Sequence, residues 1–137
     1  MGSADIQSDR MGTSSRFVEA HGCYLVLKGA RTLIAGPQGD TYINPTGNPA
    51  LSAGGTGDVL TGLIGGFLAR GWPLAKAAGA GVYLHGLAAD LLGEEMGPSG
   101  ILAGELLGVL PRIMFSLSQG KWPLHGHPFH RDLCQGL

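Results

Sequence analysis

Asn44-Pro-Thr-Gly-Asn-Pro-Ala-Leu-Ser-Ala-Gly-Gly-Thr-Gly-Asp58 is the stretch that decides the fold, because it is a loop that runs directly into an apolar helix. Two prolines and a glycine exclude a helix or strand interior over Asn44–Pro49. The start of a helix leaves backbone N–H groups without partners and carries a positive dipole, so it attracts anions. Gly54, Gly55 and Gly57 lack the Cβ atoms that would keep an oxyanion away. We therefore expect a phosphate-binding turn.

Asp58 closes this turn and admits two interpretations. A carboxylate at the N-cap or in the first turn of a helix is common there without any catalytic role. After an oxyanion site, however, it is placed to take a proton from a hydroxyl that attacks phosphorus. The spacing is neither that of a Walker loop nor that of a G-x-G-x-x-G motif. We favour a general base.

Three short apolar runs precede the loop and predict strands. Cys23–Leu27 is continuous and rich in β-formers, which indicates burial on both faces, as in an α/β sheet. Thr32–Ala35 and Thr41–Ile43 are joined by the turn signal Pro37-Gln-Gly-Asp40, which predicts an antiparallel hairpin at the side of that sheet. Lys28 follows the first run. A lysine there is usually solvated, but ligands of open α/β sheets bind at the carboxyl ends of strands.

Helical patterns flank this region. The apolar spacing from Ala4 to Ala20 predicts one amphipathic helix closed by Gly22. Downstream, three helices are expected over Asp58–Arg70, Leu74–Gly93 and Gly100 to about Leu117, the last interrupted by Pro111. Small residues in these helices predict tight backbone packing, which would recover the helix propensity that the glycines lose. Those residues are Gly62, Gly65, Gly66, Ala77, Ala78, Gly79, Ala80 and Gly81. His85, within the second of these helices, fits a packed or capped histidine better than a catalyst.

Composition excludes several classes of protein. The chain has 137 residues, 44% of them hydrophobic, and fits one small globular domain. Its net charge of −1, with no basic stripe, makes nucleic acid an unexpected partner. No apolar run reaches the ~18 residues of a membrane span, and the start of the chain resembles no targeting segment, so we expect a cytoplasmic protein. Cys23 and Cys134 are expected to be free thiols. Lys121–Leu137 is expected to be poorly ordered, with solvated histidines; no metal site is predicted.

The run from Leu25 through Gly71 carries a family resemblance. It combines L-K-G-A-x-T, N-P-T-G-N-P and A-G-G-T-G-D, and the similarity extends from about Ile6 to about Pro111. Together these motifs closely resemble the C-terminal half of the ADP/ATP-dependent NAD(P)H-hydrate dehydratases, members of the ribokinase-like superfamily. The resemblance implies an α/β, ribokinase-like partial domain over residues 1–118, with short strands and a hairpin followed by three Gly/Ala-rich helices, and a tail over 119–137.

The resemblance also implies an activity and a site. A nucleoside phosphate, ATP or ADP with Mg²⁺, would drive removal of water from NAD(P)H hydrate and return NADH or NADPH. Asp58 would be the general base and substrate contact, and Gly55, Thr56 and Gly57 would build the anion hole. The nucleotide would be cradled by two segments: Lys28, Gly29, Ala30, Arg31 and Thr32, and Asn48, Pro49, Ala50, Leu51, Ser52, Ala53, Gly54, Gly55, Thr56 and Gly57.

Two alternatives stay open. The first is another ribokinase-like kinase that acts on a vitamin precursor or a sugar alcohol; Asn44–Pro49 favours the dehydratase. The second is a non-catalytic fragment that retains part of a nucleotide-binding surface, which the length favours because members of the resembling family are longer. We therefore expect the chain to be a homo-oligomer or to lack an N-terminal half, and to bind nucleotide weakly without turnover on its own. The sequence leaves open whether ATP or ADP is the donor.

Overall fold

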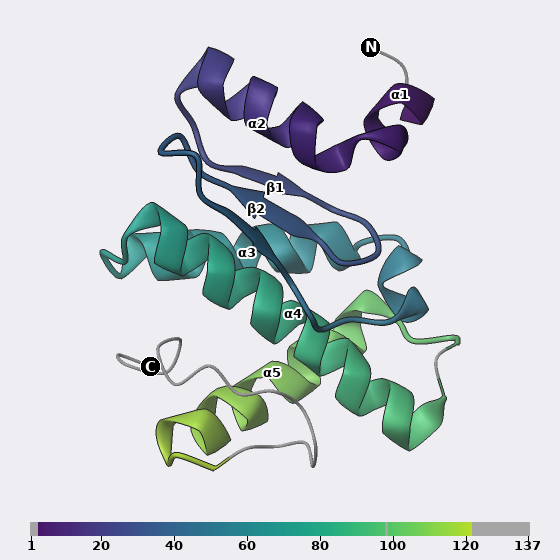
Figure 1. Cartoon of the computed structure of the whole chain (residues 1–137). Helices are drawn as coiled ribbons and strands as arrows, with labels where there is room; N and C mark the ends of the chain where they lie inside the picture. Colours follow the sequence, from purple (N-terminus) through teal and green to yellow (C-terminus); the bar gives the residue numbers. More distant parts are fainter. Residues whose placement is uncertain (1–2, 98, 122–137) are drawn as a thin grey trace. The chain divides into compact units, whose positions relative to one another are not determined.

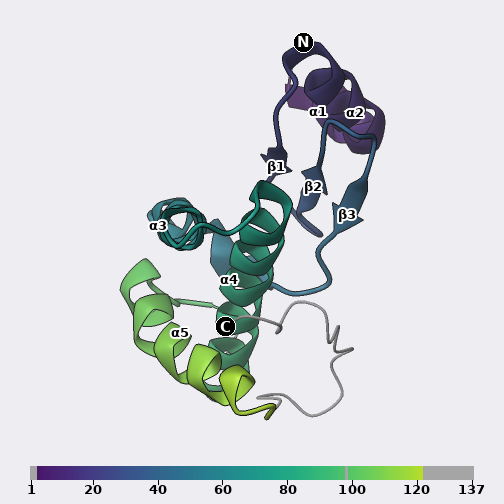
Figure 2. The same cartoon turned by 90° about the vertical axis from the view of Figure 1, so that its left-hand side faces the viewer.

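The computed structural model describes residues 3–97 and 99–121. The chain divides into two compact units, Met1–Pro45 and Thr46–Leu137, and each is described by itself. Figure 1 and Figure 2 show their elements from two directions. Most of the expected tail, together with Cys134, lies outside the described residues. In the part of the chain that is described, no helix is both long and apolar enough to cross a membrane.

The first unit begins with two helices, where one was predicted. α1 covers Ser3–Ser8 and α2 covers Arg10–His21. The break arises at Asp9, whose carboxylate accepts a hydrogen bond from the Gly12 amide at 2.9 Å and so caps a new helix. The continuous helix expected from Ala4 to Ala20 is therefore wrong. Its end is right, because Gly22 closes α2 in the left-handed conformation at φ 62°.

The sheet of this unit is an antiparallel meander in the order β1-β2-β3. β1 covers Leu25–Leu27, β2 covers Leu33–Ala35 and β3 covers Thr41–Ile43. The predicted hairpin is confirmed, since Leu33 pairs with Ile43 and Ala35 with Thr41. Burial on both faces of the first strand is wrong: β1 is half-buried at the sheet edge, whereas β2, paired on both sides, is buried. Residues 23 and 24 precede the strand.

The second unit is helical. It begins with a 3₁₀ turn, η1 (Pro49–Ser52), followed by α3 (Thr56–Ala69), α4 (Leu74–Met96) and α5 (Ala103–Ser118). α4 packs against both α3 and α5 (Figure 2). Its apolar side chains form the centre of a core that α5 completes. Burial of this apolar surface is the main favourable term in folding such a unit.

Helix α5 runs without interruption through Pro111, contrary to expectation. Proline deprives the Leu107 carbonyl oxygen of its hydrogen bond. Both residues are exposed, so water can replace that partner. On the opposite face the helix buries four side chains at helical spacing, and these hold it in one piece: Leu106, Leu110, Ile113 and Leu117.

The glycines of the helices have two different environments. Gly81 packs tightly as predicted, because a Cβ there would meet the Ile64 side chain at 2.5 Å. Gly62, Gly65 and Gly66 do not, since a Cβ at any of the three would find no atom within 4 Å. Tight packing was the wrong explanation for these three residues, which lie on the exposed side of α3.

Candidate functional site

The loop that leads into the glycine turn is held against α4. Thr46 Oγ1 donates to the Tyr83 carbonyl oxygen at 2.9 Å, and the Gly47 amide donates to Asp90 Oδ2 at 2.8 Å. The close approach requires glycine at position 86, because a Cβ there would collide with both the side chain and the backbone of Thr46. The loop is therefore positioned by a buried helix rather than by its own sequence alone.

Asn48 continues this attachment. Its Oδ1 accepts a hydrogen bond from the Ala50 amide at 3.0 Å, which caps η1, and its Nδ2 donates to the Ala89 carbonyl oxygen at 2.6 Å. Gly93 leaves room for it, since a Cβ there would lie 2.7 Å from Asn48 Nδ2. Both ends of the Asn48 amide are thus used within the protein, and we infer that this predicted binding residue acts by fixing the loop.

Two buried residues, Thr56 and His85, fix the end of the glycine turn through hydrogen bonds. Thr56 is 1% exposed and is the first residue of α3; its hydroxyl lies 2.8 Å from the Leu51 carbonyl oxygen and 2.9 Å from that of Ala53. His85, 4% exposed, donates from Nε2 to the Thr56 carbonyl oxygen at 2.7 Å. A carbonyl can only accept, so Nε2 carries the proton. His85 is packed, as expected, yet it also supports the site.

The glycine turn presents backbone amides at the start of α3. Gly55 is the N-cap residue, adopts φ 84° and provides no side-chain cap. Within the described residues, the amides of Gly54, Gly55 and Gly57 make no hydrogen bond. Gly54 and Gly55 are exposed and Gly57 is half-buried. These unpaired N–H groups, at the positive end of a helix of 14 residues, suit an oxyanion.

Asp58 lies beside these amides in the first turn of α3. Its own amide donates to the Gly55 carbonyl oxygen at 3.1 Å, which fixes the backbone. Its side chain is exposed and, in the described part of the chain, has neither a hydrogen bond nor an ion pair. A carboxylate that is not occupied by the protein remains available to a bound hydroxyl, as a general base requires.

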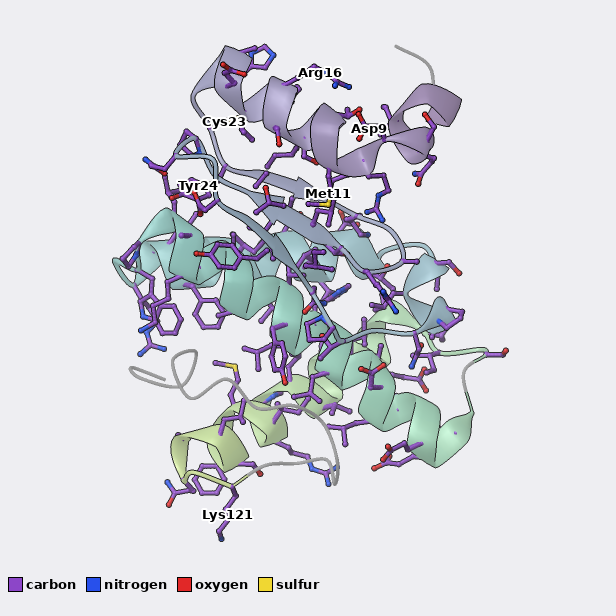
Figure 3. All side chains as sticks on the ribbon, in the orientation of Figure 1. Asp9, Met11, Arg16, Cys23, Tyr24 and Lys121 are labelled. Atoms are coloured by element: carbon purple, nitrogen blue, oxygen red, sulfur yellow. The ribbon has the colours of Figure 1, made fainter. Side chains whose placement is uncertain are left out.

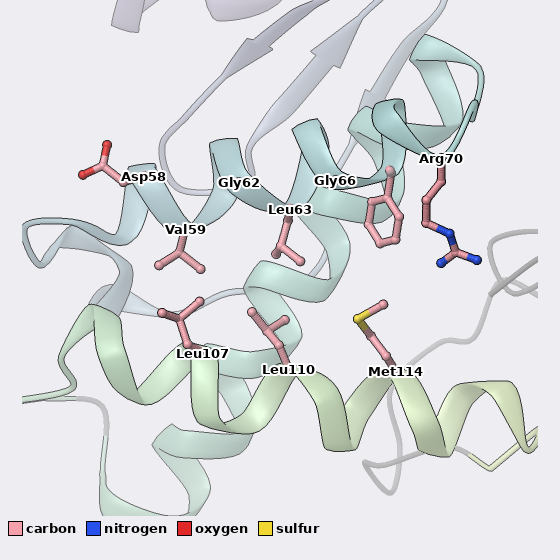
Figure 4. Close-up of a pocket in the computed structure, with 10 residues that line it drawn as sticks. Asp58, Val59, Gly62, Leu63, Gly66, Arg70, Leu107, Leu110 and Met114 are labelled. Atoms are coloured by element: carbon pink, nitrogen blue, oxygen red, sulfur yellow. The ribbon is translucent and has the colours of Figure 1, made fainter.

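A cavity of about 560 Å³ lies between α3 and α5, with Asp58 and Arg70 among its lining residues (Figure 4). Its walls are otherwise apolar: Val59 and Leu63 from α3 face Leu107, Leu110 and Met114 from α5, and Gly62, Gly66 and Phe67 complete the lining. The Asp58 side chain points away from the space between the two helices (Figure 4), so the cavity presents a mainly apolar surface.

The second predicted binding segment, Lys28–Thr32, belongs to the first unit. Lys28, Gly29, Ala30 and Arg31 are exposed, and Thr32 Oγ1 donates to the Gly29 carbonyl oxygen at 3.2 Å. Gly29 and Arg31 both adopt positive φ, at 144° and 55°. The residues from position 48 to position 57 lie together in the second unit, where Ala50 is buried in the core and its side chain is not open to a ligand.

Gly55→Val is expected to lower the free energy of unfolding by about 1–3 kcal/mol, because valine is strained at positive φ and its Cβ would lie 3.2 Å from that of Ala103. Gly55→Asn should cost less, since asparagine tolerates the left-handed conformation. Gly54→Ala is the matched control, with no atom within 4 Å of its Cβ. Thermal unfolding checks all three. Equal stability of the valine and asparagine variants would contradict the role of the left-handed cap.

His85→Leu is expected to destabilise the chain by about 1–3 kcal/mol, because the buried Thr56 carbonyl oxygen loses a hydrogen bond. Thr61→Ala on α3 removes an exposed hydrogen bond to the Gly57 carbonyl oxygen and should change stability by less than about 0.5 kcal/mol. Urea unfolding of both variants measures the difference. If the two changes were equal, His85 would not be a support of the glycine turn.

Comparison with solved structures defines the class of protein. A ribokinase-like superfamily protein from Enterococcus faecalis superimposes with a TM-score of 0.69 at 35% identity, over 77% of this chain and 36% of that one. The crystal structure of the ADP/ATP-dependent NAD(P)H-hydrate dehydratase from Bacillus subtilis, co-crystallized with ATP/Mg²⁺, matches with a TM-score of 0.76 at 42% identity, over 79% of this chain and 39% of that one. The fold is therefore α/β and ribokinase-like.

Sequence comparison defines the family. The family described as NAD(P)H-hydrate dehydratase matches residues 1–112. The ADP-dependent (S)-NAD(P)H-hydrate dehydratase of Neisseria meningitidis serogroup B is 45% identical over 104 residues, which are 75% of this chain and 35% of that protein. This chain belongs to the NAD(P)H-hydrate dehydratase family. It spans 35% of the length of the Neisseria meningitidis protein, 39% of the crystallised Bacillus subtilis chain and 22% of the bifunctional NAD(P)H-hydrate repair enzyme of Moorella thermoacetica, which it also matches.

Proposed function

We propose that this chain takes part in the nucleotide-dependent dehydration of NAD(P)H hydrate, which returns NADH or NADPH. The observation that carries the proposal is the exposed glycine turn at the start of α3, which has no side-chain cap, directly followed by Asp58, whose carboxylate has no partner among the described residues. The proposed anion site and the proposed base are thus four consecutive residues, Gly55 to Asp58, at the start of one helix. Membership of the dehydratase family supports this reading of the geometry.

The proposed chemistry has two steps. Asp58 accepts the proton of the hydroxyl on the hydrated ring while that oxygen bonds to the terminal phosphorus of the nucleotide, whose bridging P–O bond breaks. The amides of Gly55 and Gly57 stabilise the charge that develops on the phosphoryl oxygens. The ring C–O bond then breaks, inorganic phosphate leaves, and loss of a ring proton restores the double bond. Phosphate departs more readily than hydroxide, which is why the nucleotide is needed.

The nucleotide itself is proposed to use both predicted segments, Lys28–Thr32 and Asn48–Gly57. The first offers two exposed cations, Lys28 and Arg31, and the second offers amides that make no hydrogen bond to any residue the structure describes. Cations and N–H donors both recognise phosphate oxygens. From the geometry, Asn48 and Ala50 are proposed to contribute through the position of the backbone, not through contact with the nucleotide.

Mg²⁺ is proposed to accompany the nucleotide. Among the described residues there is no cluster of three or more His, Cys, Asp or Glu side chains. Mg²⁺ in phosphoryl-transfer sites commonly keeps several waters and binds through one or two carboxylates together with substrate phosphates, so a large cluster is not required. Asp58 is the carboxylate nearest the glycine turn in sequence. The ion would supply neutralisation of phosphate charge.

Absorbance of reduced nicotinamide tests the proposal. The assay uses a chimera in which this chain replaces the matching segment of the Bacillus subtilis dehydratase. The Bacillus subtilis protein supplies the remaining length of a family member. Reduced nicotinamide should form from its hydrate with ATP or ADP present and not without nucleotide. Phosphorylation of a sugar alcohol or vitamin precursor instead would identify a kinase, and failure of both reactions would contradict a catalytic role.

A further inference from the structure

Arg10, the first residue of α2, reaches across the first unit to the turn after β1. Its Nη1 donates to the Ala30 carbonyl oxygen at 2.7 Å, and its Nη2 donates to the Leu27 carbonyl oxygen at 2.9 Å. A longer contact of 3.3 Å joins Nη2 to the Lys28 carbonyl oxygen. One guanidinium group therefore binds three carbonyls of a turn that lies 17 to 20 residues away in sequence.

This arrangement fixes where the amides of the turn point. In a trans peptide the C=O and the following N–H point in opposite directions. With the carbonyls of residues 27, 28 and 30 directed at the guanidinium, the amides of Lys28, Gly29 and Arg31 are directed away from it. In the described part of the chain these three amides make no hydrogen bond. The turn thus offers a set of donors on the side opposite Arg10.

Glycine at position 29 is part of the same arrangement. Its φ of 144° disfavours any other residue, and a Cβ there would lie 3.0 Å from Arg10 Nη2. Arg10 Nε is buried and finds no partner among the described residues. Leaving a buried N–H unpaired costs free energy, so the bonds to the turn must offset that cost. The hydrogen bonds to the turn fix the Arg10 guanidinium, and the absence of a Cβ at Gly29 leaves the space that the guanidinium occupies.

We propose that Arg10 is a positioning residue of the nucleotide site: by binding the carbonyl side of Lys28–Thr32, it presents the amides of this turn to acceptor atoms of the nucleotide. This inference rests on the proposed function, in which the turn binds ADP or ATP. Arg10 contacts no reacting atom. Its contribution is preorganisation, since a turn already held in its binding conformation loses less entropy when the nucleotide binds.

Calorimetric titration with ADP of Arg10→Met and Arg10→Lys tests the inference. Each variant is compared with the unaltered chain at a temperature at which circular dichroism shows all of them folded. Arg10→Met should weaken ADP binding by about tenfold or more. The ADP affinity of Arg10→Lys should lie between that of the unaltered chain and that of Arg10→Met. Lysine keeps the positive charge but lacks the planar guanidinium that binds several carbonyls at once. In the chimera, Arg10→Met should raise KM for the nucleotide and leave kcat unchanged.

Arg16→Met is the matched control. Arg16 lies on the same helix but is exposed, and its contact with Asp9, 3.4 Å long, is a surface ion pair; both residues are labelled in Figure 3. Its loss should leave ADP binding within about twofold. The amide resonances of residues 28, 29 and 31 should shift in Arg10→Met and stay in place in Arg16→Met.

Two results would overturn the inference, and they are distinguishable. If the unaltered chain binds ADP and Arg10→Met binds it equally well, the positioning role is wrong while the proposed function stands. If the unaltered chain shows no ADP binding at all, the nucleotide role of this turn fails, and the inference fails with it. In the first of these two cases, a loss of thermal stability in Arg10→Met would show that Arg10 has a structural role alone.

Discussion

Asp58→Asn is expected to lower kcat for the dehydration of NAD(P)H hydrate by about 10²–10⁴-fold, the usual contribution of a positioned general base. Asparagine has nearly the same shape but cannot accept the hydroxyl proton. Nucleotide affinity should stay within a few fold, because the donors of the glycine turn are backbone amides that the substitution leaves in place. Loss of a carboxylate from the first turn of α3 should cost about 0.3–1 kcal/mol of stability.

The assay for this variant follows formation of reduced nicotinamide in the chimera. Glu95→Gln is the matched control, since it also neutralises an exposed carboxylate but lies near the end of α4. That control should retain full activity. If Asp58→Asn kept most of its turnover, Asp58 would not be the base, and the ordinary interpretation of a first-turn carboxylate would be the correct one.

Gly86→Ala is expected to destabilise the second unit, although it replaces a glycine by an alanine within a helix. Alanine is favoured over glycine in a helix by about 1 kcal/mol, so on propensity alone α4 should gain. The new Cβ would, however, overlap the backbone of Thr46, which cannot move without breaking its hydrogen bond to the Tyr83 carbonyl oxygen. Overpacking of this kind costs about 1–3 kcal/mol. The net change should be a loss of stability.

Gly65→Ala provides the matched control for this prediction. It makes the same substitution within a helix, at a position where a Cβ finds no atom within 4 Å. The control should therefore stabilise the chain by about 0.5–1 kcal/mol. Urea unfolding of the two variants gives opposite signs if the loop is held against α4 as described. Stabilisation by both substitutions would contradict the contact between Thr46 and Gly86.

Local sequence signals predicted much of the fold. The β-rich runs and the Gly-Asp turn placed β2 and β3, and the prolines placed the loop over Asn44–Pro49. Helix boundaries were less accurate where a side chain made the cap. The carboxylate of Asp9 divides the first helical pattern, and that of Glu105 accepts a hydrogen bond from the Leu102 amide at 2.6 Å, so α5 starts at Ala103.

Local sequence patterns did not predict the residues that hold the site in position. The glycine turn and Asp58 form a contiguous motif, so the sequence alone placed them together. Arg10 and His85 act instead through hydrogen bonds to carbonyls at least 17 residues away. Every residue has a backbone carbonyl, so the identity of the partner residue does not reveal such a bond. A signal did exist for His85: a polar residue in a helix that is otherwise Ala, Gly and Leu must find a buried partner.

The central claim is that the amides of the glycine turn bind the phosphates of a nucleotide, and resonance shifts of those amides test it most directly. The chain is labelled with ¹⁵N and titrated with ADP and Mg²⁺, and then separately with adenosine. The account predicts that ADP shifts the amide resonances of Gly54, Gly55 and Gly57 and that adenosine leaves them in place. Equal shifts with adenosine, or shifts with ADP elsewhere but not at these three amides, would contradict it.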